Sequence, residues 1–295
     1  MQNILITGTS SGFGELIART LLQKGYAVAA TMRELNGKNA DAARRLKALA
    51  GQIPGRLHLF ELDVTSEASV SRAVEQAAEA MGSVEVVVNN AGYGLGGFME
   101  AVTTEQLNHQ LDVNVTGVHR VMRAVLPGMR QSGKGLIINI SSIMGRVVVP
   151  FATAYTTSKY ALEGLSESYH YELARTGVDV VIVEPGAFGT HFMTNMIGGQ
   201  DQDRIDSYGD LAGLPDTMWQ NLGNTLKGEN APDPQDVADA VLHLIETAPG
   251  RRPLRTVVDP LLGGEGPMNI NRAAEQIQAQ MLEGMGFKDL LGVKG

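Results

Sequence analysis

The sequence predicts a single α/β domain, built on a doubly wound, seven-stranded and mainly parallel sheet with helices on both faces. Short apolar runs rich in β-branched residues alternate with segments of helical periodicity up to about residue 260. No Ser/Pro/Gly-rich linker divides this alternation. The 295 residues, 43% of them hydrophobic and 19% charged, are enough to bury one large core.

The expected elements follow one another in a regular order of strand and helix. Strands are expected over residues 3–7, 26–31, 56–62, 84–88, 136–140, 178–183 and 254–258. Helices are expected over residues 15–24, 40–50, 66–81, 104–130, 154–175, 234–247 and 268–286, with Ser66 as an N-cap. We expect a catalytic domain over 1–260 and a helical extension of the same domain over 261–295. Within the first, 188–227 is a strandless insertion that covers a ligand.

Composition excludes several classes of protein. The net charge of −8 and the pI of about 5.3 argue against binding to nucleic acid or to an anionic membrane. The absence of cysteine excludes disulfides and thiolate metal sites, and the six histidines have no metal-ligand spacing. The spacing of the histidines therefore predicts no metal centre. There is neither a signal peptide nor an apolar run of about 20 residues, and we expect a cytoplasmic protein.

A glycine-rich loop lies between the first expected strand and the first helix. It reads Thr7-Gly8-Thr9-Ser10-Ser11-Gly12-Phe13-Gly14. Glycines here permit a tight turn and a close approach of the backbone to a pyrophosphate, which the N-terminus of the following helix would face. The spacing G-x-x-x-G-x-G differs from the usual G-x-G-x-x-G, and an ordinary loop is the alternative.

The end of the second strand bears on the choice of dinucleotide. NAD-dependent proteins place a carboxylate there for the ribose hydroxyls, whereas a 2′-phosphate favours a nearby arginine. Thr31 stands where the acid would be, and Arg33 is close enough to bind a phosphate. Glu34 could instead pair with Arg33. The pattern favours NADP(H), with NAD(H) as the other possibility.

Tyr155 and Lys159 are spaced for acid–base chemistry. They are four residues apart, so on a helix both side chains share one face. A nearby ammonium favours the phenolate and is expected to lower the tyrosine pKa from about 10. Ser142 could hold the oxygen whose proton Tyr155 transfers. Such a tyrosine–lysine pair on a helix also arises by chance, so its meaning depends on the other motifs.

These motifs together resemble the short-chain dehydrogenase/reductase family over residues 1 to about 260. They occur in the family's order: the glycine loop, Asp63-Val64, Asn89-Asn90-Ala91-Gly92, Asn114, Ser142, Tyr155 with Lys159, and Pro185-Gly186 with Thr190. The resemblance implies a Rossmann-type fold. It implies cofactor contacts from Gly8, Ser10, Ser11, Gly12, Phe13, Gly14, Arg33, Asp63, Val64, Asn90, Ala91, Gly92, Tyr155, Lys159, Pro185, Gly186 and Thr190.

The resemblance also assigns individual roles. It implies a catalytic set of Asn114, Ser142, Tyr155 and Lys159, with Asn114 holding a water that links Lys159 to solvent. Ser141 competes with Ser142, but the family's serine lies thirteen residues before the tyrosine, which selects Ser142. Structural alternatives are that Asp63 caps a loop and that Thr190 caps a helix. Asn89 is expected to tie neighbouring strands together.

The expected activity is that of an NAD(P)-dependent oxidoreductase and carbonyl reductase. Hydride would pass between the nicotinamide and a carbonyl or alcohol carbon of a neutral, rather apolar small molecule, with Tyr155 as acid and base. The walls of the pocket are expected over 93–99, 143–149 and 188–219, which are apolar and rich in methionine. A non-catalytic NADP(H)-binding sensor is the alternative. The resemblance further implies a homodimer or homotetramer.

Overall fold

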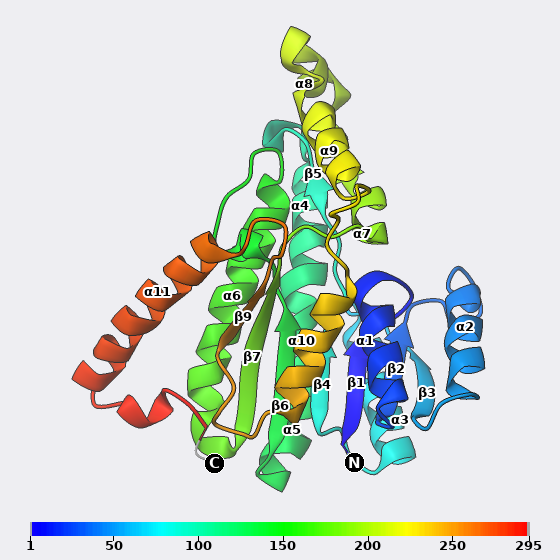
Figure 1. Ribbon diagram of the computed structural model, residues 1–295, viewed down its shortest axis with the longest axis vertical. Coiled ribbons are helices and arrows are strands. Elements are labelled where there is room, and N and C mark those ends of the chain that lie inside the picture. Colours follow the sequence, from blue (N-terminus) through cyan, green and yellow to red (C-terminus); the bar gives the residue numbers. More distant parts are fainter. Residues whose placement is uncertain (1, 294–295) are drawn as a thin grey trace.

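The computed structural model describes residues 2–293. Residues 1, 294 and 295, which the expected domain ranges include, lie outside the described residues. Within that range the main sheet has seven strands, in the order β3-β2-β1-β4-β6-β7-β9, and every pair is parallel (Figure 1). They are β1 (Asn3–Thr7), β2 (Ala27–Met32), β3 (Arg56–Glu61), β4 (Val86–Asn89), β6 (Gly135–Ile140), β7 (Val178–Pro185) and β9 (Arg255–Val258).

Helices cover both faces of this sheet, as the alternation predicted. They are α1 (Gly12–Gln23), α2 (Ala40–Ala50), α3 (Glu67–Met81), α4 (Thr104–Leu111), α5 (Gly117–Ser132), α6 (Thr153–Leu173), α7 (His191–Thr194), α8 (Gln202–Ser207), α9 (Leu214–Thr225), α10 (Gln235–Glu246) and α11 (Glu265–Gly284). Ser66 caps α3 and accepts a hydrogen bond from the N–H of Ser69, as expected. None of the helices within residues 2–293 is long and apolar enough to cross a membrane.

The first helix begins at Gly12 rather than at residue 15, β7 runs to Pro185 rather than to residue 183, and two further expected elements differ in kind from the structure. The expected helix over 104–130 is divided by a π-turn, Asp112–Thr116, in which the N–H of Gly117 donates to the carbonyl of Asp112. The expected strandless insertion over 188–227 contains β8 (Ile197–Gly198), which pairs in parallel with β5 (Leu95–Gly96). These two strands are each two residues long, too short for a periodic pattern to reveal.

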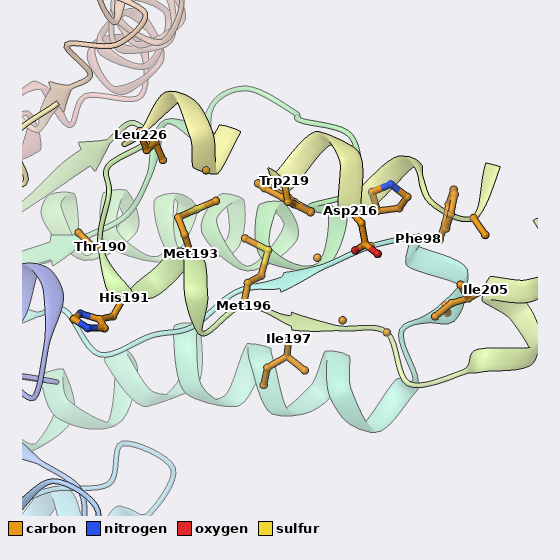
Figure 2. A pocket seen from close by; sticks show the side chains of 18 of the residues that line it. Phe98, Thr190, His191, Met193, Met196, Ile197, Ile205, Asp216, Trp219 and Leu226 are labelled. Atoms are coloured by element: carbon orange, nitrogen blue, oxygen red, sulfur yellow. The ribbon is translucent and has the colours of Figure 1, made fainter. Parts of the chain in front are cut away.

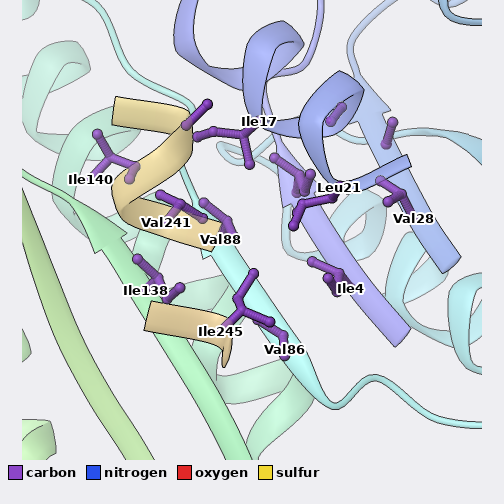
Figure 3. Packing of buried hydrophobic residues seen from close by; sticks show 14 of the residues in the cluster. Ile4, Ile17, Leu21, Val28, Val86, Val88, Ile138, Ile140, Val241 and Ile245 are labelled. Atoms are coloured by element: carbon purple, nitrogen blue, oxygen red, sulfur yellow. The ribbon is translucent and has the colours of Figure 1, made fainter. Parts of the chain in front are cut away.

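Alternate residues of each central strand pack into two separate hydrophobic cores, one on each face of the sheet. Ile4 and Ile6 pack with α1 and α10 on one face, whereas Leu5 packs with α3 and α5 on the other. Figure 3 shows the first core, where Ile17 and Leu21 of α1 and Val241 of α10 lie over the strands. Burial of each such side chain contributes about 1.5–3 kcal/mol, so both faces hold the strands in register.

The strand order reverses beside β1, and this sets the position of the site. β1 lies between β2 and β4, so connections leave it in opposite directions. The crevice above the carboxyl ends of strands at such a switch point is where open α/β sheets bind ligands. In Figure 1, β5 and helices α7–α9 stand beyond these strand ends, at the top of the view. The C-terminal helix α11 leans away from the sheet beside α6.

Candidate active site

A cleft of about 880 Å³ lies at the carboxyl ends of the strands. It brings together nearly all of the site residues predicted from the sequence. These are Gly8, Ser10, Ser11, Gly12, Phe13, Arg33, Asp63, Val64, Asn90, Ala91, Gly92, Ser142, Tyr155, Lys159, Pro185, Gly186 and Thr190. Gly14 and Asn114 stand behind this surface and act on it through contacts described below.

The glycine loop is packed too closely for side chains at two positions. Gly8 has a φ of +72°, and a Cβ atom there would lie 2.9 Å from the Cα of Ala91. A Cβ atom on Gly14 would lie 2.2 Å from the carbonyl oxygen of Gly8 and 2.5 Å from Nδ2 of Asn90. That Asn90 amide donates to the carbonyls of Thr7 and Gly8, both at 2.9 Å. The loop is therefore fixed by backbone contact and by Asn90.

The same loop leaves room for a phosphate at the start of α1. A Cβ atom on Gly12 would have open space around it, with Thr190 Cβ nearest at 3.8 Å. Ser11, the N-cap, makes no side-chain hydrogen bond to the described helix. The first N–H groups of a helix lack intrahelical partners and attract anions. These residues therefore fit the pyrophosphate of a dinucleotide.

Two cations, Arg33 and Lys38, line the far end of the cleft together with Glu34. Thr31 is buried and donates to the carbonyl of Ile6, so no carboxylate takes the place expected for binding ribose hydroxyls. Arg33 lines the cleft and forms no ion pair with Glu34 in the described chain, so the pairing suggested as an alternative is absent. Lys38 lines the same end, and sequence reasoning missed it. Its position five residues after Arg33 was the available signal.

Asp63 is oriented by its own loop. Its carboxylate accepts hydrogen bonds from the N–H and the hydroxyl of Thr65, at 2.9 and 2.7 Å. Burial alone would raise the pKa of Asp63, but these bonds and the charges of Arg33 and His109 outweigh it and hold the pKa below its usual range. The loop-capping alternative is thus present in the geometry, while the carboxylate still lines the cleft.

Ser142 and Tyr155 meet at the centre of the cleft. Ser142 has extended backbone, accepts from the N–H of Met144 at 3.1 Å and donates to the carbonyl of Pro185 at 3.3 Å. Tyr155 lies in the first turn of α6, and its phenol interacts with the Ser142 side chain, which lowers the pKa of the phenol. Both polar groups therefore face one point, where a substrate oxygen can contact them together.

The expected lowering of the Tyr155 pKa by Lys159 is wrong for this arrangement. Burial raises the pKa of Tyr155 well above its usual value, and the interaction with Ser142 offsets only part of that shift. Lys159 Nζ lies 5.5 Å from the centre of the Tyr155 ring and donates to the carbonyl of Ile140 at 2.8 Å. Burial lowers the pKa of Lys159 to about 8, although the charge of Glu163 opposes the shift. Tyr155 therefore keeps its proton at neutral pH.

Asn114 is a buried connector in the π-turn. Its Nδ2 donates to the carbonyl of Tyr93 and to the Ser158 hydroxyl, both at 3.0 Å. Its Oδ1 accepts from the N–H of Tyr93 at 3.1 Å. Asn114 thus joins the loop after β4 to the catalytic helix α6. The π-turn provides the extra residue that turns this mid-helix asparagine inward. The water relay implied by the resemblance stays a prediction.

Two expected structural roles are confirmed. Asn89 Nδ2 donates to Asn139 Oδ1 at 2.8 Å, which ties β4 to β6. Thr190 caps α7 and accepts from the N–H of Phe192 at 3.3 Å, while its side chain also lines the cleft. Gly186 is required by packing, since a Cβ atom there would lie 2.2 Å from Asp259 Oδ1.

A buried ionic cluster behind the cleft escaped sequence reasoning. Arg255, whose side chain is 1% exposed, contacts Glu163 at 2.9 Å, Glu167 at 2.6 Å and Glu184 at 3.5 Å. Glu163 follows Lys159 by one helical turn, so the cluster lies directly beneath the catalytic helix face. Asn271 of α11 donates to Glu184 at 2.7 Å and thereby connects the C-terminal helix to the cluster. No group of metal-ligating side chains occurs anywhere in residues 2–293.

The sheet, the glycine cradle and the Ser142–Tyr155–Lys159 group define a dinucleotide-dependent oxidoreductase. Residues 2–200 match the family model for short chain dehydrogenases, and the chain belongs to that family. It is 35% identical over 266 residues to 3-ketodihydrosphingosine reductase of Bacteroides thetaiotaomicron, covering 88% of this chain and 89% of the relative.

Solved structures agree with this family. A short-chain dehydrogenase from Streptomyces avermitilis superimposes with a TM-score of 0.75 at 30% identity, covering 96% of this chain and 97% of that one. A variant of actinorhodin polyketide ketoreductase, solved with NADPH, gives a TM-score of 0.71 at 28% identity, covering 90% of this chain and 97% of that one. The predicted family and fold class are therefore confirmed.

Proposed function

We propose that the chain is an NADP(H)-preferring reductase or dehydrogenase that acts on the carbonyl or alcohol group of a neutral, rather apolar small molecule. One observation carries this proposal: Ser142, Tyr155 and Lys159 line the same cleft as the glycine loop. The nicotinamide would supply or accept the hydride. The relative from Bacteroides thetaiotaomicron is, by its name, the reductase of a keto compound, which supports a carbonyl substrate.

Tyr155 acts as the proton donor in the reducing direction. Its raised pKa keeps the phenol protonated at neutral pH, and the neighbouring Ser142 hydroxyl orients the same substrate oxygen. As hydride reaches the carbonyl carbon, the oxygen gains negative charge and takes the phenolic proton. A positioned acid of this kind contributes about 10²–10⁴-fold to the rate.

Lys159 and Asn114 support that step. The Lys159 ammonium, held by the carbonyl of Ile140, lies close enough to stabilise the phenolate left behind and to bind the nicotinamide ribose. Asn114 holds the Tyr93 backbone and the Ser158 hydroxyl in place beside the first turns of α6. A water bound to the remaining lone pair of the Asn114 Oδ1 would pass a proton from solvent through Lys159 to Tyr155.

Arg33 and Lys38 support the choice of NADP(H). Both cations line the end of the cleft where β2 terminates, and Asn39 Nδ2 steadies the loop by donating to the carbonyl of Arg33 at 2.7 Å. A 2′-phosphate would be bound by this pair, whereas the hydroxyl of NAD(H) would leave it unused. The NADPH in the actinorhodin ketoreductase variant is consistent with this preference.

The substrate end of the cleft supports an uncharged ligand. Tyr93, Met144, Val149, Met196 and Leu222 line it. Arg146, which lies within the expected wall 143–149, is not among the lining residues of the cleft in the described chain. Its charge acts instead on the half-buried Glu167 and the buried Glu184. A phosphate or carboxylate would therefore find no clamp beside Tyr155.

Domain organisation, assembly and location extend the proposal. We assign 261–295 to the same domain as 1–260, because Asn271 is bonded to Glu184 of β7. We also propose a cytoplasmic homodimer or homotetramer, in line with the family resemblance and the absence of cysteine. Light scattering of the purified protein tests the assembly, and a monomer at micromolar concentration would contradict it.

Cofactor consumption tests the proposed function. Oxidation of NADPH and of NADH is followed by nicotinamide absorbance against a panel of uncharged ketones and aldehydes, with charged keto acids of similar size as controls. We expect turnover of apolar ketones with NADPH, slower turnover with NADH and little with the keto acids. Binding of NADPH without turnover of any carbonyl or alcohol would contradict the proposal.

A further inference from the structure

A second cavity, of about 590 Å³, adjoins the catalytic cleft (Figure 2). It lies between the β5–β8 pair and helices α7 and α9. The residues that line both cavities are Thr190, His191, Met193, Met196, Ile197 and Trp219. Because the two spaces share these side chains, only a thin wall separates the second cavity from the cleft that contains Tyr155.

Met196 and Trp219 form part of that wall over the strand β5. A Cβ atom on Gly96 would lie 2.6 Å from Met196 Sδ and 3.0 Å from Trp219 Nε1, so both side chains rest directly on the glycine backbone. Figure 2 shows Met193, Met196 and Trp219 gathered around the cavity. A methionine side chain has three rotatable bonds and re-packs easily, so a ligand chain can displace it and join the two spaces.

The lining of the second cavity is suited to an uncharged chain. Phe98, Ile205, Pro215 and Leu226 line it together with the shared methionines. His191, Asp216 and Lys227 are its titratable members, and all three side chains are solvent-exposed. With one acid and one lysine at the surface, the interior offers no anion clamp, and apolar contact dominates.

Trp219 provides an independent sign of a ligand. Its indole Nε1 is buried and has no hydrogen-bond acceptor within the described chain. An unsatisfied buried donor costs about 1–3 kcal/mol, so a partner from outside the chain would stabilise it. An oxygen atom on a ligand passing between the two cavities would satisfy this N–H.

Size also indicates that both cavities serve one substrate. The 880 Å³ cleft must hold a dinucleotide as well as the reacting group, which leaves limited space beside Tyr155. The second cavity, at 590 Å³, lies within the range of about 300–1,000 Å³ in which proteins bury a whole small molecule. A short ketone would leave it unused.

We propose that the substrate is an elongated, uncharged carbonyl compound whose chain runs past Met196 and Trp219 into the second cavity and carries an oxygen acceptor near Trp219. This inference rests on the proposed function and extends it to a substrate class. The reacting carbon stays beside Ser142 and Tyr155, while the remote chain provides binding energy that fixes its position.

Chain length tests the second cavity. Methyl ketones from butanone to tridecanone are compared with NADPH as cofactor. Each methylene that enters the cavity is expected to raise kcat/KM about fourfold, until the cavity is full. Gly223→Leu should reduce the rise of kcat/KM with chain length but keep the turnover of butanone within twofold of the wild-type value. Gly223 lines only the second cavity and has open space around it.

Gly213→Leu is the matched control, because Gly213 also has open space around it but lines neither cavity. It should keep the chain-length series of the wild type. The role of the second cavity would be overturned if kcat/KM rose equally with chain length in the wild type and in Gly223→Leu, or did not rise in the wild type at all. Either result would leave the proposed function intact. Lack of turnover of every ketone would instead count against the proposed function.

Trp219 gives a readout that needs no turnover, since it is the single tryptophan of the chain. Tridecanone should change its fluorescence in a saturable way, and Gly223→Leu should weaken that binding at least tenfold while Gly213→Leu does not. The proposal would be overturned if tridecanone caused no saturable change in Trp219 fluorescence, or if Gly223→Leu bound tridecanone as tightly as the wild type. This test does not require the protein to turn over any ketone.

Trp219→Phe tests the buried donor. Long ketones with an ester oxygen stepped along the chain are compared with the all-carbon ketone of equal length. At one oxygen position, kcat/KM should rise about fivefold to tenfold in the wild type, and Trp219→Phe should abolish that rise. If no oxygen position is preferred, the assignment of the Trp219 indole as a substrate contact is wrong.

Discussion

The glycine loop on the cofactor side of the cleft and the helices α8 and α9 of the substrate segment 188–227 differ in how tightly they are packed. On the cofactor side, a single methyl group on Gly14 would meet backbone at 2.2 Å. In the substrate segment, Cβ atoms on Gly213 and Gly223 would meet nothing within 4 Å. The ion pairs differ as well: the Arg255 side chain behind the catalytic helix is 1% exposed, whereas that of Arg204 in α8 is 52% exposed.

The difference shows which part of the site is constrained by chemistry common to all substrates. A dinucleotide has one shape, so the backbone that holds it can be close-packed and rigid. The substrate segment instead carries exposed apolar residues such as Leu211 and Leu214, and its cavity is bounded by methionines that can re-pack. Substitutions should therefore be costly on the first side and tolerated on the second.

Arg255→Met is expected to have the largest effect on stability. It leaves the carboxylates of Glu163 and Glu184 buried without their cation, and breaking a buried pair in this way costs about 3–5 kcal/mol of unfolding free energy. Arg204→Met, the matched change in the substrate segment, should leave stability nearly unchanged because its partners Glu100 and Asp201 are solvated. Urea denaturation measures the unfolding free energy of both variants. Equal losses of unfolding free energy would contradict the distinction between the buried and the solvated ion pairs.

Gly14→Ala should weaken NADPH binding about tenfold to a hundredfold. The added methyl group must displace the Gly8 carbonyl or the Asn90 amide, a strain of about 1–3 kcal/mol. Gly223→Ala has room for the methyl group and should bind NADPH normally. Titration by nicotinamide fluorescence measures both. Normal NADPH affinity in Gly14→Ala would show that the loop adapts and is not a rigid cradle.

Arg33→Gln should reduce the affinity for NADPH about tenfold and leave that for NADH unchanged, since it removes a charged contact to the 2′-phosphate alone. Lys38 would retain part of the phosphate contact, so we expect Lys38→Gln to act in the same direction with a smaller effect. Equal losses of affinity for NADPH and NADH would show that Arg33 has a structural role and does not bind the 2′-phosphate.

Glu184→Gln should give the smallest effect, on the pH dependence of stability. Burial, followed by the charge of Glu163, raises the pKa of Glu184, while Asn271, Arg255 and Arg146 oppose the shift. A raised pKa means that the folded state binds more protons, so stability falls as pH rises above about 4.3 towards that pKa. Thermal unfolding at about pH 6 and 8 measures this fall, which the variant should reduce. An equal fall in both proteins would assign the pH dependence elsewhere.

The sequence predicted the parts of the fold and site that depend on contiguous motifs. The bounds of β1 and α2 are those expected, because apolar runs and helix-forming residues specify them locally. The glycine loop and the Tyr155–Lys159 pair were likewise readable, since a turn and one helical face fix their geometry.

The rest depended on residues far apart in the chain. The residues of the Arg255 cluster come from α6, β7, β9 and α11, and no local pattern predicts that Glu163 and Glu184 lie close together. The Tyr155 pKa depends on burial that the sequence does not display, which is why the expected direction of its shift was wrong. The two-residue strand β8 and the π-turn around Asn114 are set by tertiary contacts.

The role of Tyr155 in proton transfer is tested by comparing Tyr155→Phe with Tyr160→Phe. Tyr160 is the next tyrosine on α6, 42% exposed and outside the cleft, so it is a matched control. We expect Tyr155→Phe to lose at least about a hundredfold in kcat with unchanged NADPH affinity, whereas Tyr160→Phe should keep both. Near-normal kcat in Tyr155→Phe would contradict the assignment of this phenol as the acid and base of the reaction.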